Sequence, residues 1–128
     1  MRLLLDTHAL IWYVDQDHSL SRAAHAAITD PANALLLISG SIWEIAIKVG
    51  LKKLSLSLPY RTWIDQAIAD LGLRVLPITA EYADTQLTFP YHHRDPFDRL
   101  LAAQAIVENV PLVSADPVFS QYGVACIW

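Results

Sequence analysis

Four short apolar runs, separated by segments with helical spacing, determine which folds this chain can adopt. The runs are Leu3–Leu5, Ala34–Ile38, Arg74–Leu76 and Pro111–Ser114. They show little alternation of polar and apolar residues, which is typical of strands that are buried on both faces of a sheet. Apolar strands that alternate with helices indicate a parallel sheet covered by helices on both sides. The sequence therefore predicts an α/β fold with three α/β/α layers around a central, mainly parallel sheet, and it leaves the strand order open.

Helix signals fill the segments between these runs. Ser19 or Ser21 is placed to cap a helix that continues to Ile28, and Asp95 followed by Pro96 is a strong helix start. Further helices are expected over residues 7–14, 39–49, 59–71, 79–87 and 95–108. No repeat, low-complexity tract or linker composition divides these segments. We therefore expect one domain that spans residues 1–128.

The composition limits the class of protein. Hydrophobic residues make up 54% of the chain and charged residues only 17%, which excludes a disordered polar tail because such segments bury too little apolar surface to fold. The longest uncharged stretch, Pro31–Trp43, is shorter than the roughly 20 apolar residues of a membrane-spanning helix. The first residues reach Asp6 too early for a signal peptide, and Cys126 has no cysteine to pair with. We expect a cytoplasmic protein without a membrane segment.

Four acidic residues fall where a parallel sheet would bring them together. Asp6 directly follows the first predicted strand, and Asp116 follows the fourth. Glu44 lies early in the helix after the second strand, and Asp98 lies in the first turn of the helix before the fourth. All four positions belong to the carboxyl edge of the sheet, where open α/β sheets bind ligands.

Each of these acids also has a purely structural explanation. Asp6 and Asp116 are placed to cap the turns that follow them, and Asp98 interacts favourably with the dipole of its own helix. Glu44 and Lys48 are spaced for an ordinary pair on one helix face. The joint pattern favours a shared site instead, because Glu44 is the only charged residue between Asp30 and Lys48.

Carboxylates that share one edge need a cation. Two negative charges 4 Å apart repel by about 4 kcal/mol at an effective dielectric constant near 20. Oxygen ligands of this kind suit Mg²⁺ or Mn²⁺. Such ions polarise a phosphoryl oxygen and lower the pKa of water, which is the chemistry of phosphodiester hydrolysis. The net charge of −4 argues against nucleic-acid binding through a basic surface alone, although several basic residues flank the acids and are candidate backbone contacts: Lys48, Lys52, Lys53, Arg94 and Arg99.

At this point the chain resembles a known family. The segments Leu4–Trp12, Ser41–Ile45, His93–Ala105 and Leu112–Asp116 are similar to the motifs of PIN-domain ribonucleases, in particular the VapC-type toxins of type II toxin–antitoxin systems. The resemblance runs through essentially the whole chain in order. It implies a PIN-like fold and a Mg²⁺- or Mn²⁺-dependent endoribonuclease. It also implies an RNA substrate, a homodimer and a small antitoxin protein that neutralises the toxin.

The resemblance also assigns residues. It carries the acidic quartet of the family over to the same four positions, Asp6, Glu44, Asp98 and Asp116, as metal-binding and catalytic residues. It places the hydroxyl groups of Thr7 and Ser41 beside the metal. Three further residues are weaker candidates near the metal or the substrate: His93, Asp95 and Arg99. Asp95 is equally a helix cap, and His93 is placed to touch phosphate or to brace the start of the helix.

Other readings of the sequence were weighed. A response-regulator receiver domain needs an acceptor aspartate after its third strand and a late lysine, but no aspartate lies between Asp30 and Asp65 and no lysine follows Lys53. A non-catalytic PIN-like module that binds RNA or protein remains the alternative, although it gives no reason to keep all four acids.

No histidine or cysteine spacing supports zinc. We expect the tryptophans to pack rather than to stack on bases, and Cys126 to fill the core.

Overall fold

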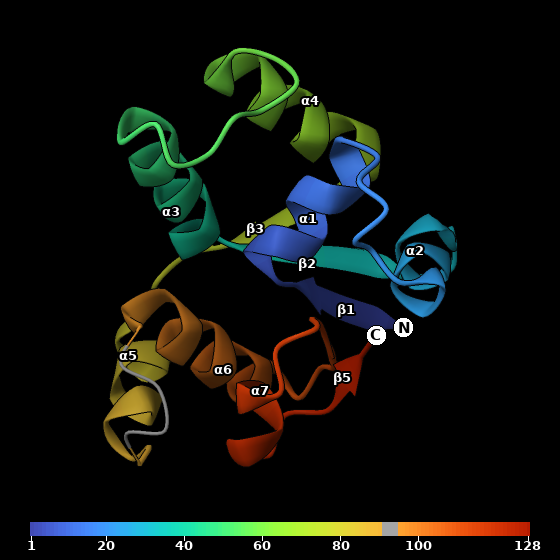
Figure 1. Cartoon of the computed structure of the whole chain (residues 1–128). Helices are drawn as coiled ribbons and strands as arrows, with labels where there is room; N and C mark the ends of the chain where they lie inside the picture. Colours follow the sequence, from blue (N-terminus) through green and yellow to red (C-terminus); the bar gives the residue numbers. More distant parts are fainter. Residues whose placement is uncertain (91–94) are drawn as a thin grey trace.

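The computed structural model describes residues 1–90 and 95–128, and it contains one sheet with helices on both faces (Figure 1). The strands are β1 (Arg2–Leu5), β2 (Ala34–Ile38), β3 (Arg74–Leu76), β4 (Leu112–Val113) and β5 (Cys126–Ile127). Their order is β3-β2-β1-β4-β5, and every neighbouring pair is parallel. The predicted α/β class is therefore confirmed.

The helices lie close to the predicted ranges. They are α1 (Thr7–Val14), α2 (Arg22–Thr29), α3 (Ser39–Gly50), α4 (Tyr60–Leu71), α5 (Ala80–Leu87), α6 (Pro96–Glu108) and α7 (Val118–Gln121). The cap of α2 is Ser21, whose hydroxyl accepts a hydrogen bond from the backbone of Ala24. The short helix α7 was not predicted. Within the described part of the chain, no helix combines the length and the apolar character that crossing a membrane requires.

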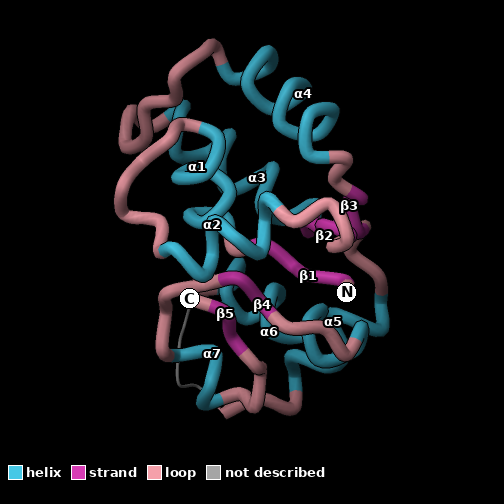
Figure 2. The backbone as a smooth tube through the Cα atoms, turned by 90° about the vertical axis from the view of Figure 1, so that its right-hand side faces the viewer, coloured by secondary structure: helices cyan, strands magenta, loops and turns pink. Residues whose placement is uncertain are grey.

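Alternate residues of the central strands enter two separate cores. Leu3 and Leu5 of β1 pack in one core with Ile45 and Trp63, whereas Leu4 packs in the other with residues of α6 and α7. The helices accordingly divide between the two faces, with α1, α3 and α4 above the strands and α5, α6 and α7 below them (Figure 2). Burial on both faces explains why the strands read as apolar runs without alternation.

The end of the chain corrects one expectation. We expected Cys126 to fill the core, but it lies in β5 and is exposed. The strand β5 pairs with β4, where Leu112 lies opposite Cys126 and Val113 opposite Ile127. In this edge strand only Ile127 packs against a core, because neighbouring side chains of a strand point to opposite faces.

The sheet order reverses direction at β1, because β2 lies on one side of β1 and β4 on the other. Such a reversal opens a crevice at the carboxyl ends of the strands. The start of α3 comes close to α6 there: a Cβ atom added at Gly40 would lie 3.0 Å from a side-chain carbon of Leu100. Glycine at this position allows the first turns of α3 and α6 to lie beside the crevice.

Candidate metal-binding site

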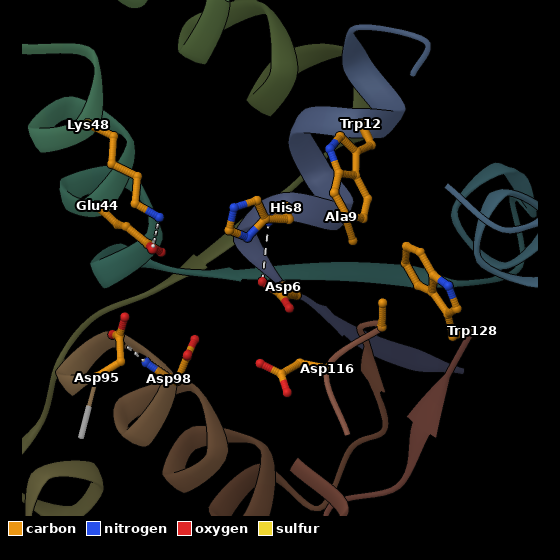
Figure 3. Close-up of a pocket in the computed structure, with 11 residues that line it drawn as sticks. Asp6, His8, Ala9, Trp12, Glu44, Lys48, Asp95, Asp98, Asp116 and Trp128 are labelled. Carbon is orange, nitrogen blue, oxygen red and sulfur yellow. Dashed lines mark hydrogen bonds and ion pairs between the residues drawn. The ribbon is translucent and has the colours of Figure 1, made fainter. Parts of the chain in front are cut away.

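A pocket of about 230 Å³ opens at the carboxyl ends of β1 and β4 (Figure 3). All four acids predicted to meet, and Asp95 in addition, line it. The rest of the wall is formed mainly by one lysine and three aromatic side chains: Lys48, His8, Trp12 and Trp128. In Figure 3 the acidic side chains come from the junction of β1 and α1, from α3, from the start of α6 and from the loop after β4, and they surround a common space.

Asp6 connects the two central strands of the site. It follows β1 and caps α1, since its Oδ1 accepts a hydrogen bond of 3.2 Å from the backbone N–H of His8. Its Oδ2 accepts a hydrogen bond of 2.6 Å from the hydroxyl of Ser114, which in turn accepts one from the backbone N–H of Asp116. A hydrogen-bonded chain therefore joins the ends of β1 and β4.

Burial controls the charge of Asp6. Only 8% of this residue is exposed, and burial raises the pKa of its carboxyl group above the ordinary value. The hydrogen bond from Ser114 and the nearby His8 act in the opposite direction, while the negative charge of Glu44 raises the pKa further. Ionisation of Asp6 in the fold therefore carries a desolvation cost that its hydrogen bonds only partly offset.

Glu44 is neutralised by a lysine of its own helix. The carboxylate is 5% exposed, and its Oε2 lies 2.8 Å from the Nζ of Lys48, one turn further along α3. Lys48 remains about one-third exposed. The structure thus supplies one cation to the pocket and places it on the Glu44 side (Figure 3).

The remaining three acids of the pocket stand at helix starts. Asp95 caps α6, because its Oδ1 accepts hydrogen bonds from the backbone N–H groups of Phe97 and Asp98. Asp98 in the first turn of α6 lines the pocket beside it. Asp116 caps the short helix α7 through the backbone N–H of Val118. Asp95 and Asp116 therefore accept backbone hydrogen bonds at helix starts, as a purely structural role predicts, and they also line the shared pocket.

Two buried hydroxyl groups hold the helices of the site together. The Thr7 hydroxyl donates a hydrogen bond of 2.8 Å to the Ser41 hydroxyl, which links the first turns of α1 and α3. Thr7 is 3% exposed and Ser41 is 1% exposed, so water does not compete for this bond. Thr7 directly follows Asp6, and Ser41 lies three residues before Glu44, so the contact joins the two segments that carry these acids.

Comparison with known proteins agrees with this geometry. A family model of the PIN domain matches residues 3–125. The chain belongs to the PIN-domain family. This PIN domain is 32% identical over 115 residues to ribonuclease VapC22 of Mycobacterium tuberculosis, and the match covers 89% of this chain and 86% of VapC22.

Solved structures show the same fold at lower identity. The structure of VapBC2 from Rickettsia felis, bound to a DNA fragment from its promoter, matches with a TM-score of 0.67 and 17% identity, over 98% of this PIN domain and 97% of that chain. VapBC-1 from nontypeable Haemophilus influenzae matches with a TM-score of 0.67 and 17% identity, over 98% and 96% of the two chains.

The weaker site candidates of this PIN domain separate. Asp95 lines the pocket, and Thr7 and Ser41 support it from below, but Arg99 does not line it. Arg99 is 5% exposed, and its guanidinium donates hydrogen bonds to Gln86 and to the backbone carbonyl of Pro90. These contacts give Arg99 a structural role between α5 and α6. His93 lies outside the described residues.

Sequence reasoning gave too little weight to four residues of the site. Ser114 appears in the sequence only as the end of a predicted strand, although it is 2% exposed and holds Asp6. The tryptophans were expected to pack, yet Trp12 and Trp128 line the pocket together with His8. His8 and Trp12 are four residues apart and share a face of α1, whereas the sequence carries no signal for Trp128, which reaches the pocket through the pairing of β5 with β4.

The described acidic side chains of the pocket do not converge on a single point. Within residues 1–90 and 95–128, no three acidic, histidine or cysteine side chains form a group that could hold a metal ion as they stand. This spacing is the arrangement expected for carboxylates that repel one another, because separation lowers their mutual repulsion. The donor groups of the site are carboxylate oxygens throughout, which is the chemistry that Mg²⁺ and Mn²⁺ prefer.

The raised pKa of Asp6 predicts a pH-dependent change in stability. A group whose pKa is raised by folding stabilises the protein when it is protonated, and this contribution is lost as the pH rises through the raised value. We therefore expect Asp6→Asn to increase the free energy of unfolding at pH 7, measured by urea denaturation with EDTA present. The gain should shrink as the pH falls towards 3.8, the ordinary value for this group.

Asp84→Asn, at an exposed acid of α5, serves as the control and should show no such trend. A lower stability of Asp6→Asn at pH 7 would mean that the hydrogen bonds of the carboxylate outweigh its burial.

Two ion pairs each lie within a single helix, one at the pocket and one on the surface. They allow a matched test of how much the pocket pair contributes to stability. Lys48→Met removes the partner of buried Glu44 and should lower the free energy of unfolding by about 1–2 kcal/mol. Arg61→Met breaks a pair with the same spacing, Arg61–Asp65, whose side chains are 83% and 56% exposed. This control should change stability by less than about 0.5 kcal/mol. Equal losses in the two variants would show that Glu44 does not depend on Lys48.

Proposed function

We propose that this PIN domain is a metal-dependent endoribonuclease that hydrolyses phosphodiester bonds in RNA. The observation that supports this most strongly is the meeting of Asp6, Glu44, Asp98 and Asp116 at one pocket, from four separate parts of the chain. The name of the relative VapC22, a ribonuclease, supports the same activity. A purely structural origin explains each acid alone but gives no reason for their common location.

The four carboxylates are proposed to hold Mg²⁺, or Mn²⁺ in its place. A bound ion of this kind supplies polarisation of a phosphoryl oxygen and a more acidic water for attack on phosphorus. Asp6 is already oriented for such a role by Ser114, which fixes one of its oxygens. Lys48 is placed to balance the charge of Glu44 until an ion or a phosphate group enters the pocket.

The size of the pocket favours a polymer over a small molecule. Its volume of about 230 Å³ is below the roughly 300–1,000 Å³ of typical small-molecule sites, and its mouth is open. We propose that one phosphate group of the strand lies at the pocket and that the rest of the strand lies across its rim. This arrangement suits cleavage within an RNA strand.

Removal of one proposed ligand should abolish the reaction. Asp98→Asn is expected to lower the rate of RNA cleavage with Mg²⁺ by roughly two orders of magnitude or more, because a neutral amide is a poor replacement for a carboxylate ligand. Cleavage is measured on an end-labelled RNA, and circular dichroism checks the fold. Asp84→Asn should cleave like the wild type. Full activity in Asp98→Asn would overturn the assignment.

Metal binding gives a second readout that does not depend on activity. Millimolar Mg²⁺ or Mn²⁺ should raise the melting temperature of the wild type, because a ligand that binds only the native state stabilises it. EDTA should reverse the shift, and Asp98→Asn should reduce it. A non-catalytic PIN-like module would give cleavage by neither protein.

We further propose that the protein is the toxin of a two-component pair, active in the cytoplasm as a homodimer and neutralised by a small antitoxin protein. Support comes from the relative VapC22 and from the fold shared with the VapBC structures. This role needs the nuclease activity, so it fails if the nuclease fails.

Expression in a bacterial host tests the toxin role. The wild type should arrest growth, and the variant Asp98→Asn should not, because the arrest depends on cleavage of RNA. Co-expression of the neighbouring reading frame should restore growth. An arrest that persists in Asp98→Asn would point to a toxicity unrelated to this site.

A further inference from the structure

Three aromatic rings form a continuous row along one wall of the acidic pocket. The ring centroids of His8 and Trp12 are 5.7 Å apart with their planes tilted by 47°, and those of Trp12 and Trp128 are 5.7 Å apart with a tilt of 59°, so each ring presents its own face. All three residues line the pocket together with the carboxylates. In Figure 3 the two tryptophans stand on the opposite side of the acids from Lys48. The pocket therefore has an aromatic side and a cationic side.

The row joins segments that are far apart in the sequence. His8 and Trp12 come from α1, whereas Trp128 follows β5. Trp128 keeps 37% of its surface exposed, and Trp12 is partly buried against the core below α1. The exposed part of this aromatic surface lies at the rim of the pocket, where a bound chain would cross it.

The other two tryptophans show that this placement is specific. Trp63 is fully buried and donates a hydrogen bond from its ring nitrogen to Asp15, so it is a core residue. Trp43 is 63% exposed on α3 but does not line the pocket. Our expectation of packing therefore describes Trp63 and accounts only in part for Trp12 and Trp128.

The described wall of the pocket is mainly acidic, which favours an additional contact that needs no positive charge. Among residues 1–90 and 95–128, five carboxylates and one lysine line the pocket, and the whole chain carries 13 acidic and 9 basic residues. Most nucleic-acid affinity comes from basic side chains that neutralise phosphates, and this wall supplies few of them. Stacking of nucleobases on aromatic rings provides affinity without positive charge.

We propose that Trp12 and Trp128 form a stacking surface for an unpaired nucleobase of the RNA, next to the phosphate that enters the carboxylate pocket. This inference rests on the proposed nuclease function and adds the class of substrate. Only a base that is free of its complement can reach an aromatic face. The proposed contact therefore requires a single-stranded segment at this wall of the pocket, and stacking of this kind tolerates any base.

Binding of RNA to the Asp98→Asn protein with Mg²⁺ present tests the proposal without cleavage. The probe is a short fluorescent oligoadenylate, and its affinity is measured by anisotropy across a range of salt concentrations. Trp128→Ala should weaken binding about 10-fold, while the slope of affinity against salt stays the same because the ring carries no charge. Trp128→Phe should retain most of the affinity, because phenylalanine keeps an aromatic face.

Trp43→Ala is the matched control, since it removes an exposed tryptophan that lies outside the pocket. It should bind oligoadenylate like the parent. A further readout uses intrinsic tryptophan fluorescence, which AMP should quench and ribose 5-phosphate should not. Trp12→Phe extends the test to α1 without removing the part of the side chain that packs on the core.

The outcomes separate this inference from the proposed function. If the wild type cleaves RNA but Trp128→Ala binds oligoadenylate as tightly as its parent, the stacking surface is wrong and the nuclease assignment stands. The stacking surface would also be wrong if Trp128→Ala bound RNA normally but was no longer neutralised by co-expression of the neighbouring reading frame. That result would indicate that Trp128 contacts a protein partner. If the wild type cleaves no RNA and the parent binds none, both proposals fail.

Discussion

Burial of the central strands on both faces is the constraint on which the rest of the structure depends. Alternate leucines of β1 enter two different cores, so none of the three residues from Leu3 to Leu5 is available for a polar function. Polar side chains can appear only where the strands end. Because all strands are parallel, these ends meet at one edge, and the reversal of strand order at β1 opens a crevice there. The location of the acidic pocket follows from the packing of the leucines.

Two carboxylates of the same pocket are buried in well-packed surroundings. Asp6 and Glu44 are almost completely buried, yet burial opposes their ionised forms. The surrounding groups compensate locally: Ser114 and the backbone of His8 hold Asp6, and Lys48 neutralises part of the charge of Glu44. Sites of this kind cost stability and persist where function requires them. Local hydrogen bonds let the fold tolerate the carboxylates before any cation is present.

Much of the fold was predictable because local signals and tertiary packing agree. The apolar run Ala34–Ile38 is a strand with the predicted bounds, and Asp95 with Pro96 begins α6 as expected. The strand β5 was missed because a two-residue strand has no pattern of its own and exists only through its pairing with β4. For the same reason the row of Trp12 and Trp128 was not predicted, since the strand pairing brings Trp128 to the pocket.

The candidate site shows the same division. The positions of the four acids at one edge follow from topology, which depends on element order and not on side-chain detail. The hydroxyl of Ser114 was undervalued because its partner, Asp6, is distant in sequence. Arg99 was taken as a possible substrate contact because it follows Asp98, but successive residues of a helix point in different directions, and Arg99 turns into the space beside α5. The metal-binding role of the acids stays a prediction.

The proposed cleavage of RNA by an acidic protein requires recognition to be divided between different kinds of contact. A basic surface would bind any phosphate backbone, duplex or single-stranded, because charge does not distinguish them. Since Lys48 is the one lysine or arginine in the described wall of the pocket, the proposed enzyme would use the ion for one phosphate and aromatic rings for a neighbouring base. Both contacts are short-ranged, and the second is possible only where the base is unpaired. Low positive charge is thus a source of selectivity for RNA shape, since it removes the contacts that every RNA could satisfy.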